Sequence, residues 1–561
     1  MQENFKVSKI LKKSVFIVLA CSLILSACGN KTVTSENSES KTSSVSESSE
    51  ISSTESTETE SAETESTKVS STTSTKTTSK KSTLNGTFTY TEQNNAVASV
   101  VEEILPVGNT ANLSNPLTGY YDKEAEALRS EILNTENTAK LYKITGTIYY
   151  VSSINGDDLN DGTSSKAPIK SVEQISGFDL KEGDAVLFER GSTFRLYSAF
   201  NVKSGVIYGS YGTGEKPRIY GSPVNLATVE WTPSSKKNVW QMDYTYADCS
   251  SMFFEFGEQV GYRRTSMRKL AKNTDFYLDK SNNILYLYCD KGNPAKCYKS
   301  IEFGTQMKLI NISSGVHDVV IDNLCLKYSG LFAVSATWNN SGITVTNCEI
   351  GYIGGGTTSD GNSRYGNAIQ FWTGAKDIVV NHNWIYQTWD TAITWQGNNG
   401  DKYFYENIAF NYNLLEYNNA DFEFWSDDST ITDFDIIGNI MRFTSAGWGT
   451  REDDGGYRGI DGCFDGDLAG MASVKNVVIK NNTIDSPARY ILNLEVDATV
   501  YSNMTVSGTK VYVNPDMRSL DVILRSFIVS EEQENNAVAT DTASLLKIMQ
   551  YFDSTVVAKY K

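Results

Sequence analysis

The sequence predicts an all-β protein built as a parallel β-helix, a solenoid of stacked coils. Between residues 319 and 484, short β-branched runs repeat one pattern, as in VVIDNLCL, ITVTNCEI, IVVNHNWI and IAFNYNLL. Each run alternates apolar and polar residues, passes an Asn and returns to an apolar residue. No stretch here carries the 3.6-residue period of an amphipathic helix. A strand, a turn and a second strand therefore form each coil.

Asparagine marks the expected turn in each copy of the repeat. It recurs at Asn383, Asn413, Asn439 and Asn482, and one place earlier at Asn323, Asn347 and Asn481. Asn tolerates left-handed backbone angles and can stack on the same residue of the next coil. The interval between copies varies, so we expect loops of different length between strands of constant length.

The N-terminus has the features of an export signal. Lys9, Lys12 and Lys13 precede the apolar run SVFIVLACSLILSA, which is too short to span a bilayer. The run ends in LSACG, which resembles the lipobox of bacterial lipoproteins. This resemblance implies a signal peptide over residues 1–28 and a lipid anchor on Cys28 at the outer face of the cell membrane. An ordinary secretory signal is the alternative.

Two segments separate the signal from the coils. Residues 29–83 are almost entirely Ser, Thr, Glu and Lys, so we expect a disordered tether, of a length that suits a Gram-positive envelope. Residues 84–145 are expected to form a helical capping segment, with helices near 95–105 and 123–133. At the other end, residues 528–561 are expected to cap the last coil.

The charge and cysteine content restrict the partners. A formal net charge of -17 argues against nucleic acid and weakens the case for a strongly polyanionic substrate. Beyond the signal, the cysteine spacing matches no zinc pattern. Cys289 and Cys297 could close a small loop, but the sequence favours buried free thiols. We expect a monomer.

The N-terminal part of the solenoid resembles a known family. The stretches YYVSSINGDDLNDGTSSKAPIKSVEQI, GDAVLFERGSTFR and YGSYGTGEKPRIYGS are similar to the start motif of right-handed parallel β-helix proteins of the pectin-lyase-like superfamily. The resemblance covers about residues 120–500. It implies a right-handed β-helix over 146–527 with a β-rich insertion at about 225–303. It also implies binding or cleavage of polysaccharide, by calcium-dependent lyases or by glycoside hydrolases.

The chain departs from well-known members of that superfamily. Its two histidines, His317 and His382, lie within repeat strands or turns. It lacks the Gly-His-Gly of polygalacturonases and the Trp-Ile-Asp-His of pectate lyases. Neither activity is therefore carried over residue by residue.

A second set of strands is expected to form a groove. AIQFW, AITWQ, DFEFW and GWGTR alternate, with one parity apolar and the other facing outward. The residues expected to face outward are Ala368, Gln370 and Trp372; Ala392, Thr394 and Gln396; Asp421, Glu423 and Trp425; and Gly447, Gly449 and Arg451. Exposed indoles beside acids and amides suit a sugar chain.

Paired carboxylates in this groove suggest acid–base chemistry. We predict Glu423 as the general acid, with Asp421, the better solvated carboxyl, or Asp390 as the base. The expected substrate-binding residues are Trp372, Gln370, Gln396, Trp425 and Arg451, with Arg364 and Asn367 in a neighbouring turn. Ordinary surface carboxylates are the alternative.

The loop at residues 450–467 is acidic and rich in glycine, as functional excursions from a regular scaffold often are. It could hold calcium through Asp453, Asp454, Asp461 and Asp465, although acidic loops without metal are commoner. No other cofactor is expected.

Three functions fit these observations. The first is a cell-surface glycoside hydrolase. The second is a lyase that neutralises a uronate with Ca²⁺ or Arg and removes a proton with a base; Arg451 and Arg458 are candidates. The third is a glycan-binding surface protein without turnover.

Overall fold

The structure is a computed structural model that describes residues 117–357, 364–398, 400–450, 462–467, 470–495, 501–502, 505–513 and 557–560. The expected signal with Cys28, the tether, the helix near 95–105 and most of 528–561 lie outside this part. No helix in the described part is long and apolar enough to cross a membrane.

The described chain folds as a parallel β-helix with three sheets, which confirms the predicted fold. Sheet 1 contains β1 (Ile148–Val151), β2 (Ala185–Glu189), β5 (Ile207–Tyr211), β16 (His317–Asp322), β19 (Asn340–Thr346), β24 (Ala375–Asn381), β27 (Phe404–Asn411), β30 (Thr430–Ile437), β33 (Ser473–Lys480), β36 (Tyr501–Ser502) and β37 (Thr505–Ser507). Sheet 2 contains β3 (Thr193–Arg195), β6 (Arg218–Tyr220), β17 (Cys325–Lys327), β20 (Glu349–Ile353), β25 (Trp384–Thr388), β28 (Leu414–Glu416), β31 (Ile440–Arg442), β34 (Thr483–Asp485), β38 (Lys510–Val513) and β39 (Val557–Tyr560).

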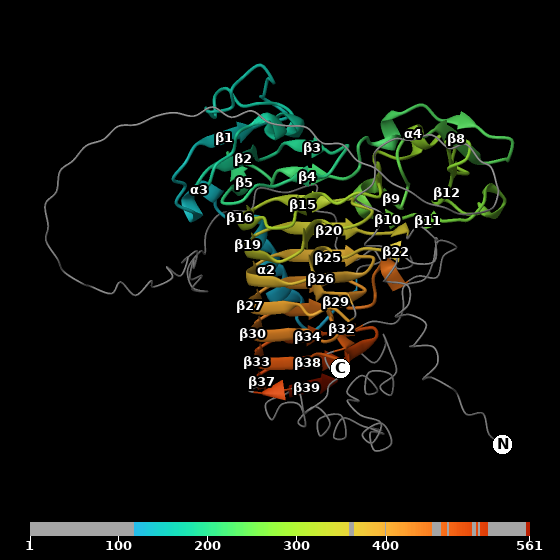
Figure 1. Cartoon of the computed structure of the whole chain (residues 1–561). Helices are drawn as coiled ribbons and strands as arrows, with labels where there is room; N and C mark the ends of the chain where they lie inside the picture. The colour runs from blue at the N-terminus through green and yellow to red at the C-terminus, as the bar shows by residue number, and fades with distance from the viewer. Residues whose placement is uncertain are drawn as a thin grey trace, which may run out of the picture. The chain divides into compact units, whose positions relative to one another are not determined.

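Sheet 3 completes each coil. It contains β4 (Phe200–Asn201), β15 (Ile310–Ile312), β18 (Val334–Thr337), β23 (Ile369–Trp372), β26 (Thr391–Gln396), β29 (Ala420–Trp425), β32 (Gly462–Asp467) and β35 (Tyr490–Glu495). A coil runs from sheet 1 to sheet 2 to sheet 3, as β24, β25 and β26 do. Successive coils lie one above another, which Figure 1 shows for β16, β19, β27, β30 and β33.

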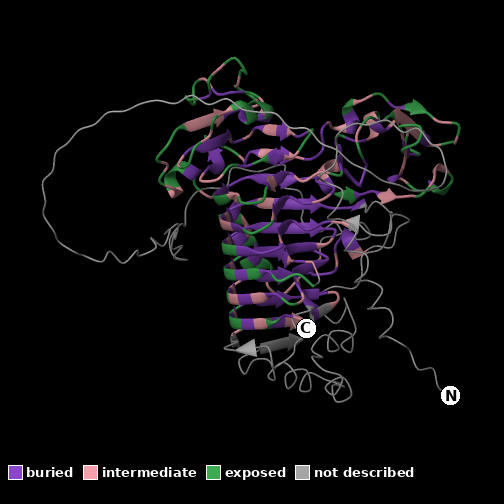
Figure 2. Cartoon of the chain, in the orientation of Figure 1, coloured by how far each residue is buried: buried purple, intermediate pink, exposed green. Residues whose placement is uncertain are grey.

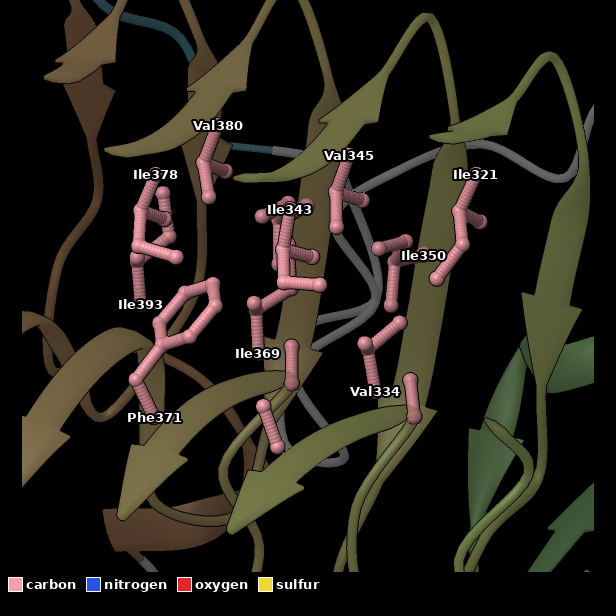
Figure 3. Packing of buried hydrophobic residues seen from close by; sticks show 14 of the residues in the cluster. Ile321, Val334, Ile343, Val345, Ile350, Ile369, Phe371, Ile378, Val380 and Ile393 are labelled. Carbon is pink, nitrogen blue, oxygen red and sulfur yellow. The ribbon is translucent and has the colours of Figure 1, made fainter. Parts of the chain in front are cut away.

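The core lies inside the coils, where the three sheets face one another. Isoleucine and valine of equivalent positions stack from coil to coil, as Ile343 and Ile378 do from sheet 1 and Ile369 and Ile393 do from sheet 3 (Figure 3). These four side chains have no exposed surface. The outer positions of sheet 1, by contrast, are exposed where its strands begin (Figure 2). Burial of one parity of each strand therefore holds the solenoid together.

The turn asparagines occupy two neighbouring positions with different roles: the first takes the left-handed backbone conformation, and the second forms hydrogen bonds between coils. Asn323, Asn347 and Asn481 adopt left-handed φ angles of 61, 52 and 55°. The residues one place later form a buried ladder between sheets 1 and 2. Along it, the backbone N–H groups of Asn383, Asn413 and Asn439 donate to the next side-chain oxygens, those of Asn413, Asn439 and Asn482, at 3.0, 2.9 and 2.9 Å. The predicted stacking of turn asparagines is confirmed.

One long helix and an insertion cover the outer face of sheet 2. Helix α2 (Asp122–Leu133), which confirms the helix predicted near 123–133, buries Ala125, Leu128 and Ile132 in the same cluster as Tyr352 and Tyr386 of sheet 2. Arg442 joins it by ion pairs to Asp122, Glu416 and Asp485. A shorter helix, α3 (Thr138–Leu141), packs against β5.

The insertion consists of two small sheets, with antiparallel pairing apart from the parallel β11–β12 pair. One contains β9 (Ser251–Phe254), β10 (Gln259–Val260) and β14 (Ile301–Gly304), and the other contains β7 (Thr232–Pro233), β8 (Val239–Asp243), β11 (Tyr262–Arg263), β12 (Asp275–Asp279) and β13 (Ile284–Tyr288). The insertion also contains the short helical turns η4 (Leu226–Thr228), η5 (Glu255–Gly257), η6 (Met267–Lys269) and α4 (Pro294–Cys297). A further short turn, η3 (Val172–Gly177), lies earlier in the chain, between β1 and β2. The insertion leaves the solenoid between β6 of sheet 2 and β15 of sheet 3. It therefore emerges at the corner where sheet 2 passes into sheet 3.

Two further excursions use that same corner, the hairpin β21 (Gly356–Thr357) and β22 (Arg364–Tyr365), and the turn η7 (Trp448–Thr450). The described cysteines beyond the signal, including Cys289 and Cys297, are free thiols, as the sequence favoured.

We predict that Asn413→Ala destabilises the solenoid by about 2–4 kcal/mol. The change leaves the buried N–H of Asn383 and the carbonyl of Val380 without the partner that Asn413 provides. Urea unfolding followed by circular dichroism measures the loss. The half-buried Asn381 of β24 is the matched control, and Asn381→Ala is expected to change the free energy of unfolding by less than about 0.5 kcal/mol. Equal losses in the two variants would refute the role of the ladder.

Candidate active site

The outward residues of sheet 3 form two rows that run from coil to coil. The strand registers pair Gln370 with Thr394, Thr394 with Glu423, and Trp372 with Gln396 and Gln396 with Trp425. The inner row consists of Gln370, Thr394, Glu423 and Asp465, and the edge row consists of Trp372, Gln396, Trp425 and Asp467. The three coils predicted to align therefore do align. Trp372 and Trp425 are half-buried and lie outside the core cluster.

The fourth predicted coil is wrong. Gly447 and Gly449 do not continue sheet 3, because β29 pairs with β32. Trp448 lies in η7, is buried, and packs against Trp389 with ring centroids 5.0 Å apart. The short alternation of GWGTR resembles that of a strand, whereas the next strand of sheet 3, β32, begins only at Gly462. Arg451 lies outside the described residues, as do Arg458, Asp453, Asp454 and Asp461 of that loop.

Glu423 lies at the centre of the two rows and is held by three neutral donors. One carboxylate oxygen accepts hydrogen bonds from Thr391 Oγ1 at 2.8 Å and from Gln396 Nε2 at 2.7 Å. The other accepts from the indole N–H of Trp425 at 2.9 Å. With 4% of its surface exposed, the side chain of Glu423 is almost fully buried. Gln396 and Trp425, predicted only as substrate ligands, thus also fix the carboxylate in place.

Asp390 shares a hydroxyl group with Glu423. It is half-buried at the corner before β26, and the Thr391 hydroxyl lies 3.5 Å from its Oδ1 and 2.8 Å from Glu423 Oε2. The two carboxyl oxygens are therefore no farther apart than the sum of these distances. The two carboxyl groups are roughly 5 to 5.5 Å apart in retaining glycosidases and roughly 6.5 to 9.5 Å apart in inverting ones. The pair is thus close enough to act on one glycosidic bond.

Asp421 differs from its predicted state. It was expected to be the better solvated carboxyl, but it is fully buried and accepts hydrogen bonds from Thr444 and Asn418. Desolvation outweighs these bonds and raises the pKa of the Asp421 carboxyl to about 8. Asp421 therefore carries a proton at neutral pH and is unsuited to be an ionised base. Its environment depends on Thr444 and Cys463, which come from the following coil.

Asp465 is an acidic neighbour of Glu423, and its predicted role in calcium binding stays a prediction because Asp453, Asp454 and Asp461 lie outside the described residues. In β32 it aligns with Glu423 on the adjacent strand and is 2% exposed. Adjacent strands are about 4.8 Å apart. The described residues contain no group of three or more His, Cys, Asp or Glu that could hold a metal ion. The alternation FDGD, which puts Phe464 in the core and Asp465 outside, was the signal available in the sequence.

The remaining predicted residues border the inner row. Asn367 donates a hydrogen bond to Gln370 Oε1 at 2.9 Å and accepts one from the backbone N–H of Thr391 at 3.3 Å. These bonds connect the corner to the inner row. Arg364 lies on β22, where the structure describes the backbone alone.

Comparisons with known proteins add a short sequence match and a likeness of fold. No family model matches the chain. A stretch of 108 residues is 37% identical to a lacto-N-biosidase of Bifidobacterium longum subsp. longum. It covers 18% of this chain and 6% of that protein, so the chain spans a small part of that relative.

Two solved structures have a similar fold. A GH136 lacto-N-biosidase from Eubacterium ramulus is 13% identical with a TM-score of 0.28, over 70% of each chain. A pectate lyase is 13% identical with a TM-score of 0.29, over 66% of this chain and 75% of its own. Both TM-scores are low, and neither likeness says what this chain does.

We predict that Asp421→Asn removes a pH dependence of stability. An aspartate in the unfolded chain has a pKa near about 3.9, whereas that of folded Asp421 is about 8. The folded state therefore binds a proton that the unfolded state lacks, and the free energy of unfolding falls as pH rises between these values. The variant should gain thermal stability relative to the original chain from pH 5 to pH 8. Parallel profiles would contradict the raised pKa, and the exposed Asp290→Asn is the control.

Proposed function

We propose that this protein is a glycoside hydrolase that cleaves a glycan in the groove of sheet 3. The observation that supports this best is the pair Glu423 and Asp390, joined through the Thr391 hydroxyl. The indoles of Trp372 and Trp425 lie along the edge row, where a pyranose ring can stack on them.

The surroundings of the two carboxyls suggest a role for each. Glu423 is nearly excluded from solvent and acts as the general acid that protonates the leaving oxygen. Asp390 is half-exposed, reaches solvent and acts as the base that activates water. Asp465 lies beside Glu423 and adds a second acidic group where positive charge develops on the sugar.

The composition of the two rows favours hydrolysis over elimination. The described inner row contains Glu423 and Asp465, and no Lys or Arg side chain is described in either row. A lyase needs a cation to neutralise the uronate carboxylate and a base to remove the adjacent proton. Acidic rows repel such a substrate, so a neutral glycan fits the groove better. The relative's name suggests lacto-N-biosides as the first substrates to test.

The same proposal includes the cellular location. An exported lipoprotein anchored through Cys28, with residues 29–83 as a tether, would place the groove outside the membrane. Radiolabelled palmitate incorporation into the chain, compared with Cys28→Ala, tests this anchor. No incorporation in the original chain would contradict it.

We predict that the two carboxyls respond differently to the leaving group of the substrate. Glu423→Gln should lower kcat/KM on a lacto-N-biose oligosaccharide by about 100- to 10,000-fold. The loss should be much smaller on p-nitrophenyl β-lacto-N-bioside, because nitrophenolate leaves without protonation. Asp390→Asn should lower both activities, because water activation is needed in each case.

Glu406→Gln is the matched control, since Glu406 is exposed on sheet 1 and pairs with Lys376. Unchanged turnover in Glu423→Gln would refute the proposed site. A product that absorbs in the ultraviolet would indicate a lyase. Binding of the oligosaccharide without any turnover in the original chain would indicate a glycan-binding protein.

A further inference from the structure

Two large aromatic side chains are exposed at the corner where sheet 3 passes into sheet 1. Trp338 directly follows β18 and is 45% exposed, and Phe404 begins β27 and is 69% exposed. The chain has nine tryptophans, all within the described residues, and the other eight are buried or half-buried. Exposure of this kind at one corner indicates a recognition surface rather than a packing role.

The corner continues the edge row of the groove. The backbone N–H of Trp338 donates to the carbonyl of Trp372 at 2.9 Å, so Trp338 lies beside that residue on the adjacent coil. The registers of Asn340 with Ala375 and of Ala375 with Tyr405 place Phe404 two coils from Asn339. Two coils correspond to a spacing of about 9.6 Å.

A glycine lies next to Asn339 on the intervening coil. Gly374 lies on the coil between them with φ of +91°. A Cβ there would lie 2.4 Å from the side-chain oxygen of Asn339 and 3.4 Å from the carbonyl oxygen of Phe404. Any larger residue at this position would displace the side chain of Asn339, so the Asn339 amide packs against Gly374 on the coil that lies between Asn339 and Phe404.

The backbone at Trp338 has a conformation that other turn residues of this solenoid, such as Tyr412, share. Trp338 and Asn339 have φ angles of 64 and 54°, in the left-handed region. This conformation costs on the order of 1 kcal/mol for a bulky residue and is easier for Asn or Gly. Since the Trp338 side chain remains exposed, burial does not offset the strain.

We propose that Trp338, Asn339 and Phe404 form an accessory glycan-binding subsite continuous with the groove through Trp372. A pyranose ring stacks on each aromatic side chain, and the Asn339 amide bonds a hydroxyl group between them. Nearby Lys376 is paired with Glu406, so a neutral sugar chain is the expected ligand. The inference rests on the proposed function for the identity of the chain that reaches this corner.

The test compares long and short substrates in the full chain. The ratio of kcat/KM for a lacto-N-biose oligosaccharide to that for p-nitrophenyl β-lacto-N-bioside should fall about 10-fold in Trp338→Ala, and similarly in Phe404→Ala. Tyr412→Ala is the matched control, because Tyr412 is also 45% exposed but lies where sheet 1 passes into sheet 2. Its ratio should not change. An unchanged ratio in both corner variants overturns the subsite.

A binding experiment separates this subsite from the catalytic proposal. The Glu423→Gln chain is applied to an array of neutral oligosaccharides, alone and combined with Trp338→Ala or Tyr412→Ala. Loss of binding when Trp338→Ala is added, but not when Tyr412→Ala is added, supports the subsite even where the original chain shows no turnover. Equal binding of all three chains, or no binding to any glycan, overturns it, whether or not Glu423 proves catalytic. Equal thermal midpoints confirm that each variant is folded.

Discussion

The register of the coils is the constraint on which the rest of the structure depends. The ladder of Asn383, Asn413, Asn439 and Asn482 connects each turn to the next through buried hydrogen bonds. Because side chains alternate along a strand, a slip of one residue would turn Glu423 into the core and expose Phe424. Burial of the stacked isoleucines and valines opposes such a slip in every coil. The two outward rows of sheet 3 therefore exist because the same register is kept over many coils.

Coverage then decides which face of the solenoid is available to a ligand. The outer aromatic residues of sheet 2, such as Tyr352 and Tyr386, are buried with α2 and with Phe253 of the insertion. Sheet 1 exposes charged residues such as Lys376 and Glu406. Sheet 3 is bordered at one corner by the insertion, the β21–β22 hairpin and η7. Its outward rows contain acids, amides and indoles, of which Trp372, Gln396 and Trp425 are half-buried, and these rows form the candidate site.

The site contains groups that do not favour a stable solenoid. Glu423, Asp421 and Asp465 have little or no exposed surface, although a carboxyl group is more stable in water. Glu423 is compensated by three neutral donors, whereas Asp421 is compensated by binding a proton. Such local conflicts with stability are typical of functional sites, because the surrounding fold supplies the free energy that holds them.

The sequence by itself determined the coil, the parity of its strands and the alignment of Gln370, Thr394 and Glu423. Those features follow from local periodicity, which a strand expresses wherever one of its faces is buried. The tertiary structure decided that Asp465 follows Glu423 in the inner row, since a long loop hides the start of β32 from any repeat. It also decided that Asp421 is buried and that Asp390 meets Glu423 at Thr391. These contacts join residues of different coils, and their geometry depends on loop lengths that no periodic pattern encodes.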